Sequence, residues 1–114
     1  MNKTRMTLLN TSVVSEYGTY TYKPLSLDEA RELVRAFQQP GKTIQSAIGH
    51  ESTAGLLSEL LGFEVPVNRM EFKQSLDDVA LVFKLKQRPP EGRILSRQEL
   101  DAIGYEFGLL TRIS

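Results

Sequence analysis

The 114-residue sequence contains no cysteine, no tryptophan and a single histidine. The missing cysteines exclude a disulfide framework, a thiolate zinc site and a thiol nucleophile. One histidine without cysteine partners cannot build a metal site of several His or Cys ligands within one chain. We therefore expect neither a metal nor another cofactor.

The sequence also lacks an excess of charge of either sign, because 14 Lys and Arg residues face 14 Asp and Glu residues. Proteins that coat long nucleic acids need a basic surface, so we expect no long nucleic acid as a partner. No apolar run approaches the about 20 residues of a membrane-spanning helix. The basic N-terminal stretch has no apolar signal-peptide region. We expect a soluble, cytoplasmic protein that does not contact a membrane.

What is present is typical of a globular protein. Hydrophobic residues make up 40% of the chain and charged residues 25%. Neither an internal repeat nor a linker-like stretch interrupts it, so residues 1–114 are predicted to form one domain.

Helix signals occur at three places. The stretches 26–29 and 96–99 both read Ser-x-x-Glu, which is a capping box at the start of a helix. These helices are expected to end before Pro40 and at Gly104. Between them, a leucine stripe that stops at Gly62 predicts a third helix with a glycine C-cap.

Strands are expected where β-branched and apolar residues cluster or alternate, at 6–14, 18–23, 43–48, 68–73, 79–86 and 105–113. The stretches 68–73 and 79–86 are expected to pair as a hairpin through the turn residues 74–78. Strands and helices intermix without strict alternation. The predicted fold class is therefore α/β, with a mixed β-sheet of about five to six strands flanked by helices.

His50 is the candidate for acid–base chemistry, because histidine is the side chain that changes charge near neutral pH. It lies at a predicted strand-to-helix junction, after Gly49 and before Glu51, Ser52 and Thr53. A helix N-terminus offers free N–H groups and the positive end of the helix dipole to a phosphate. A histidine that only lies on the surface or caps the helix fits the same pattern.

Two further stretches are candidates for ligand contacts. Residues 84–97 contain five basic side chains against one acid, Glu91, and arginine suits bidentate phosphate binding. A solvated strand edge followed by an ordinary loop gives the same composition. Asn10, Thr11 and Ser12 interrupt the first apolar strand, where they either cap a turn or donate hydrogen bonds to a ligand.

No Ser-His-Asp set, P-loop or Gly-x-Ser-x-Gly motif is found. Such a chain can still cleave RNA, because the ribose 2′-hydroxyl is an internal nucleophile. The protein then has only to align it and to protonate the leaving 5′-oxygen.

Two motifs resemble one known family. The first is Ser-Ala-Ile-Gly-His-Glu-Ser-Thr at 46–53. The second is Gln-Arg-Pro-Pro-Glu-Gly-Arg-Ile-Leu at 87–95, which follows Asn-Arg-Met-Glu at 68–71. Together they resemble the ring nucleases of viral type III anti-CRISPR proteins, whose relatives are called CRISPR-associated ring nuclease 2. The resemblance spans the whole chain and departs from the viral members at Pro89-Pro90.

The resemblance implies a homodimeric α/β protein that binds cyclic tetra-adenylate across its two-fold axis. It further implies that the ring is cut without metal into linear di-adenylates with 2′,3′-cyclic phosphate ends. Removal of this second messenger switches off the ancillary effectors of type III CRISPR defence.

The resemblance also assigns roles to residues. His50 is the general acid, Arg88 neutralises the phosphate, and Glu91 positions His50 or the ribose. The ligand-binding residues that it implies are Asn10, Thr11, Ser12, Gly49, Ser52, Asn68 and Gln87.

A different class of function fits the same composition. A protein that binds and sequesters the cyclic nucleotide, or that binds a host protein, needs a basic pocket but no proton donor. Such a sponge or interaction module tolerates loss of the His50 imidazole. A non-specific RNA-binding module is a third alternative, which the neutral charge disfavours.

Overall fold

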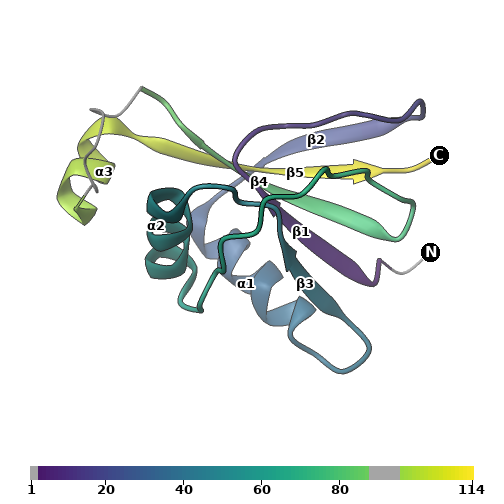
Figure 1. Cartoon of the computed structure of the whole chain (residues 1–114), viewed down its shortest axis with the longest axis horizontal. Coiled ribbons are helices and arrows are strands. Elements are labelled where there is room, and N and C mark those ends of the chain that lie inside the picture. Colours follow the sequence, from purple (N-terminus) through teal and green to yellow (C-terminus); the bar gives the residue numbers. More distant parts are fainter. Residues whose placement is uncertain (1–2, 88–95) are drawn as a thin grey trace.

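The computed structural model describes residues 3–87 and 96–114. Within them, five strands form one sheet: β1 (Arg5–Leu9), β2 (Tyr20–Leu25), β3 (Thr43–Ser46), β4 (Asp78–Leu85) and β5 (Tyr105–Arg112). Three helices accompany the sheet: α1 (Leu27–Phe37), α2 (Glu51–Leu61) and α3 (Arg97–Ile103) (Figure 1).

Both predicted capping boxes are confirmed. At the start of α1, the Ser26 hydroxyl accepts from the Glu29 N–H at 3.1 Å, and the Glu29 carboxylate accepts from the Ser26 N–H at 2.9 Å. The same pair of bonds joins Ser96 and Glu99 at the start of α3. Helix α2 ends at Gly62, whose φ of 76° is left-handed. Glycine adopts this conformation without steric cost, so the predicted C-cap is confirmed as well.

The sheet is mixed, as predicted, with the strand order β2-β5-β4-β1-β3. Strand β1 pairs in parallel with both β3 and β4, whereas β5 pairs antiparallel with β4 and β2. Strand β4 is therefore internal, and its residues from Asp78 to Phe83 are all buried. A strand that is covered on both faces is apolar on both faces, which explains its continuous hydrophobic run.

The predicted strand at 68–73 is wrong. Both hydrogen-bonding edges of β4 are already occupied, by β1 and by β5, so a hairpin with 68–73 has no free edge to use. Residues 66–73 instead run as an extended segment without strand pairing. Phe72 and Gln74 are buried, and Glu71 and Lys73 are exposed. The side chains of a segment that lies flat on a sheet alternate between buried and exposed, as they do in a strand.

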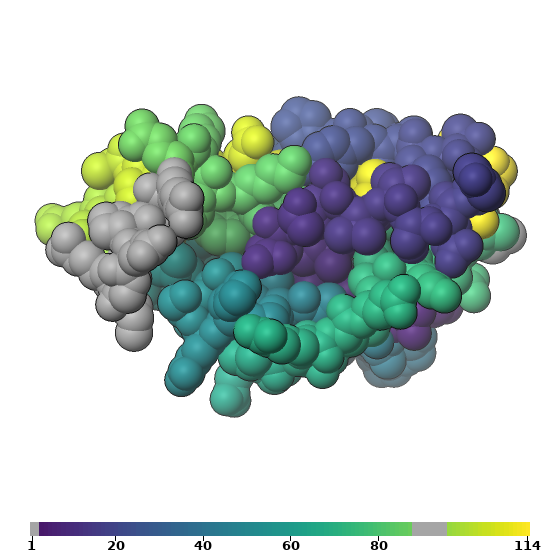
Figure 2. All heavy atoms as spheres, turned by 45° about the horizontal axis from the view of Figure 1, so that its top comes forward, coloured from purple at the N-terminus to yellow at the C-terminus, as the bar shows by residue number. Residues whose placement is uncertain are grey.

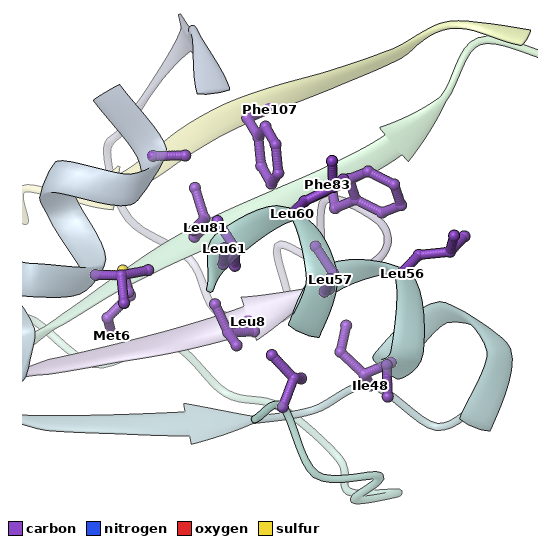
Figure 3. Packing of buried hydrophobic residues seen from close by; sticks show 14 of the residues in the cluster. Met6, Leu8, Ile48, Leu56, Leu57, Leu60, Leu61, Leu81, Phe83 and Phe107 are labelled. Carbon is purple, nitrogen blue, oxygen red and sulfur yellow. The ribbon is translucent and has the colours of Figure 1, made fainter. Parts of the chain in front are cut away.

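The two faces of the sheet are covered differently. Helices cover one face, where Met6, Leu8 and Leu81 pack against the leucines of α2 (Figure 3). The other face holds a smaller cluster that includes Leu9 and Phe72. Two segments, 10–19 and 66–75, lie side by side there (Figure 2), and the Ser15 hydroxyl donates to the Phe72 carbonyl at 3.2 Å. Each large apolar side chain that is buried in this way stabilises the fold by about 1.5–3 kcal/mol.

An ion pair with a buried carboxylate and a partly exposed guanidinium links the starts of β1 and β4. Asp78 is fully buried and accepts from Arg5 Nε at 2.6 Å and from Arg5 Nη2 at 2.9 Å. The N–H and hydroxyl of Ser75 also donate to this carboxylate, at 3.0 and 3.2 Å. Burial alone would raise the pKa of Asp78, but the bonds from Arg5 and Ser75 outweigh it and hold the pKa below its ordinary value.

Replacing Asp78 by Ala is expected to lower the free energy of unfolding by about 2–4 kcal/mol, because Ser75 and Arg5 lose their charged acceptor. Equilibrium urea unfolding measures this loss. The matched control is Asp77→Ala, since Asp77 is exposed and its change should stay within about 0.5 kcal/mol. Equal losses in the two variants would contradict the assignment.

The same pair predicts a pH dependence. Because the pKa of Asp78 is lowered in the folded state, its stabilisation is present above the unfolded pKa and is lost as pH falls through the folded pKa. The difference in unfolding free energy between wild type and Asp78→Ala should therefore shrink below about pH 4. Urea titrations at several acidic pH values measure it, and a difference that stays constant would refute the role of this carboxylate.

Candidate functional site

The candidate site lies at the edge of the sheet where the parallel strands end. Because β3, β1 and β4 run in the same direction, their carboxyl ends meet at one edge, where ligands of such sheets commonly bind. Asn10, Thr11 and Ser12 follow β1, and Gly49 and His50 follow β3. This edge lies on the side of the molecule away from the two termini (Figure 1).

His50 occupies the N-cap position of α2 with extended backbone, at φ −125° and ψ 131°. Its carbonyl accepts the first helical hydrogen bond, from the Ala54 N–H at 3.0 Å. Its side chain is exposed and makes no capping hydrogen bond. The imidazole is thus presented to solvent at the start of the helix. The alternative of a surface histidine at a helix start is confirmed in its position, while a capping bond from the side chain is not formed.

A cavity of about 250 Å³ opens at this edge. Its wall consists of Asn10 from the end of β1, Thr53 from the first turn of α2, and Phe83 and Leu85 from the end of β4. Asn10 was predicted from the sequence, but the other three were not. Thr53 belongs to the same motif as His50 and could have been included. Nothing in the sequence marks Phe83 and Leu85 as site residues, because their spacing is that of ordinary core residues in a strand.

Arg69 is a second residue that the sequence reasoning missed. It is exposed, and its Nε donates to the Gly49 carbonyl at 3.1 Å, directly before His50. A Cβ at Gly49 would lie 3.0 Å from Arg69 Cγ, which is a tight contact. Glycine at this position therefore lets a cationic side chain pack against the turn that carries His50.

The remaining predicted residues are distributed as follows. Thr11, Ser12 and Ser52 are exposed at the same edge. Asn68 is exposed, but its side-chain amide donates to the Ser46 carbonyl at 2.8 Å, so it is held by the protein itself. Gln87 lies farther out, because β4 continues from Val82, the partner of Leu9, to Leu85, about 10 Å beyond the end of β1.

Arg88 and Glu91 lie outside the described residues. Among the residues that the structure describes, no group of three or more His, Cys, Asp or Glu side chains is placed to hold a metal ion. In residues 3–87 and 96–114, none of the helices has both the length and the apolar character needed to cross a bilayer.

Comparison with known proteins reveals several relatives. The chain is 37% identical over 110 residues to the uncharacterized protein ORF117 of Acidianus two-tailed virus, covering 93% of this chain and 92% of that protein. It is 36% identical over 105 residues to the uncharacterized protein YddF of Bacillus subtilis strain 168, covering 92% and 94%. The solved structure of B116 from Sulfolobus turreted icosahedral virus matches with a TM-score of 0.78 at 26% identity, over 96% of this chain and 99% of that one.

The match to B116 shows that the mixed sheet and its helices form a known fold. A family match covers residues 6–107, which include the sheet edge with His50. The chain therefore belongs to the STIV B116-like family, and it has homologues in viruses.

Proposed function

We propose that this protein is a metal-independent ring nuclease that cleaves cyclic tetra-adenylate to linear di-adenylates with 2′,3′-cyclic phosphate ends. Cleavage removes a second messenger and so switches off the ancillary effectors of type III CRISPR defence. The motifs at 46–53 and 87–95 support this function through their resemblance to the ring nucleases. The viral homologues are compatible with such a role.

The observation that carries the proposal is the position of His50. The imidazole is exposed and is not used for capping. It lies at the start of α2, on the edge of the sheet where the parallel strands end. The first-turn N–H groups of α2 and the guanidinium of Arg69 are suited to a phosphate beside this imidazole.

The proposed chemistry needs a proton donor and a fixed phosphate. The ribose 2′-hydroxyl attacks the adjacent phosphorus and loses its proton to solvent water, and the bond from phosphorus to the 5′-oxygen breaks. His50 supplies the proton that the leaving 5′-oxygen requires. Arg88 neutralises the phosphate and Glu91 orients His50 or the ribose, both by resemblance to the family.

The cavity at the same edge of the sheet, which Thr53 from the first turn of α2 helps to line, suits a part of the ring. It combines apolar walls, Phe83 and Leu85, with the polar groups of Asn10 and Thr53, as small-molecule sites commonly do. An asparagine amide can pair with the N6 and N7 edge of adenine. At about 250 Å³ the cavity is smaller than the roughly 300–1,000 Å³ of pockets that enclose a drug-sized ligand. One chain therefore has room for a portion of the ring.

A homodimer with the ring at its two-fold axis would accommodate the whole ring, because each chain then holds one portion of it. The chain has one histidine, so a symmetric dimer offers two acids to two opposite phosphates of a four-nucleotide ring. Cleavage at those two positions yields two di-adenylates.

Replacing His50 by Ala is expected to slow single-turnover cleavage of cyclic tetra-adenylate by about 10²–10⁴-fold, because the leaving oxygen loses its proton donor. The ring should still bind, since the backbone N–H groups and Arg69 remain. Radiolabelled cyclic tetra-adenylate, incubated with excess protein in EDTA, measures the rate. Thin-layer or liquid chromatography then identifies the cyclic-phosphate di-adenylate.

A matched control is Glu51→Gln, which changes the exposed neighbour of His50 without touching the proton donor. An intact ring that binds equally tightly to wild type and to His50→Ala would replace the nuclease with a non-catalytic sponge. No binding to either protein would refute both functions.

The dimer proposal predicts a binding stoichiometry of two chains per ring. Isothermal titration calorimetry of His50→Ala with cyclic tetra-adenylate measures this ratio while the ring stays intact. Light scattering of the same sample should give twice the mass of one chain. A ratio of one chain per ring, on a monomer, would exclude a site shared at a two-fold axis.

A further inference from the structure

Two segments that are distant in sequence are joined directly before His50. The chain leaves β3 at Ser46 and enters α2 at Glu51, and residues 47–50 between them have no secondary structure of their own. Residues 66–70 lie against this stretch. The Ser46 hydroxyl donates to the Pro66 carbonyl at 2.6 Å and accepts from the Ile48 N–H at 3.2 Å.

Asn68 makes the central contacts between the two segments. Its backbone N–H donates to the Ile48 carbonyl at 2.8 Å. Its side-chain amide donates to the Ser46 carbonyl at 2.8 Å and to Met70 Sδ at 3.5 Å. The amide nitrogen of Asn68 thus has one strong partner, the Ser46 carbonyl, and one weak partner, the thioether of Met70. The side chain of this exposed residue is therefore directed to the protein's own turn.

The next residue extends the same pattern. Arg69 Nε donates to the Gly49 carbonyl at 3.1 Å. The carbonyls of Ser46, Ile48 and Gly49 thus all accept from Asn68 or Arg69, and each lies within four residues of His50. The turn is also held by the Ala47 N–H, which donates to the Leu8 carbonyl at 3.0 Å, and by the buried side chain of Ile48. The bonds from Asn68 and Arg69 are those that tie it to residues 66–70.

We propose that Asn68 is a positioning residue, which holds the turn before α2 so that the His50 imidazole keeps a fixed place at the edge of the sheet. This inference differs from the sequence-based assignment of Asn68 to direct ligand binding, and the experiment below distinguishes the two. Its kinetic consequence rests on the proposed function, whereas its structural consequence does not. A shift of about 1 Å in a reacting group can cost about 10²-fold in rate.

The test uses Asn68→Ala, which removes the amide without changing the charge that an anionic ring meets. Ser46→Ala is the second variant, because it removes another side-chain bridge between the segments. Gln39→Ala is the matched control: Gln39 is also exposed, and its amide donates to the Arg35 carbonyl at 3.3 Å at the end of α1. Thermal unfolding establishes the temperature range in which all variants are folded.

Three quantities are measured for each protein. The first is the single-turnover rate with cyclic tetra-adenylate, and the second is the Kd of the ring. The third is the pair of imidazole C–H proton NMR signals of the free protein. Because the chain has one histidine, these signals report on His50 alone and need no ligand.

We expect Asn68→Ala and Ser46→Ala to shift or broaden the His50 signals and to slow cleavage by about 10–10²-fold, with a Kd within about twofold of wild type. Gln39→Ala should change none of the three. A raised Kd together with unchanged His50 signals would overturn the proposal, because it would mean that Asn68 contacts the ring directly.

The two proposals fail in different ways. If wild type binds but does not cleave the ring, the nuclease is refuted, and the NMR signals of the free protein still decide the role of Asn68. If wild type cleaves and Asn68→Ala matches it in rate and in His50 signals, only the positioning role is refuted.

Discussion

The register between β1 and β4 is the constraint on which the rest of the structure depends. Arg5 and Asp78 are direct partners across these two parallel strands, and their side chains form the ion pair that satisfies the buried carboxylate. A slip by one residue would move every side chain of β4 to the opposite face and would leave a buried carboxylate without its cation. The pair therefore selects one register. That register sets how far β4 extends past β1 at the opposite edge, where Asn10 lies.

Much of the fold is predictable from the sequence because its signals are local. The capping boxes at Ser26 and Ser96 and the glycine at 62 act within a few residues, and each specifies a helix end in the structure. The segment 68–73 is the exception. Its alternation is real, but it arises from packing on a face of the sheet. The sequence does not reveal that both edges of β4 are occupied.

The candidate site, too, is only partly predictable from the sequence. The position of His50 at a strand-to-helix junction follows from local sequence. The contribution of Arg69 requires that residues 66–70 meet residues 46–50, and the cavity wall of Phe83 and Leu85 requires that β4 lie beside β1. These are long-range contacts with no separate signature. Arg88 and Glu91 fall outside the described residues, so their roles still rest on resemblance.

The order of the strands has a consequence for how the chain folds during synthesis. Strand β2 is made early, yet its hydrogen-bonded neighbour in the sheet is β5, which is made last. The parallel core of β3, β1 and β4 can assemble while the ribosome is still translating. Strand β2 cannot form its backbone hydrogen bonds until β5 has been synthesised. Until β5 arrives, one edge of β4 and all of β2 offer unpaired backbone groups to other chains. The C-terminal strand thus completes the sheet, and the nascent protein is most open to misassociation in the interval before that strand emerges.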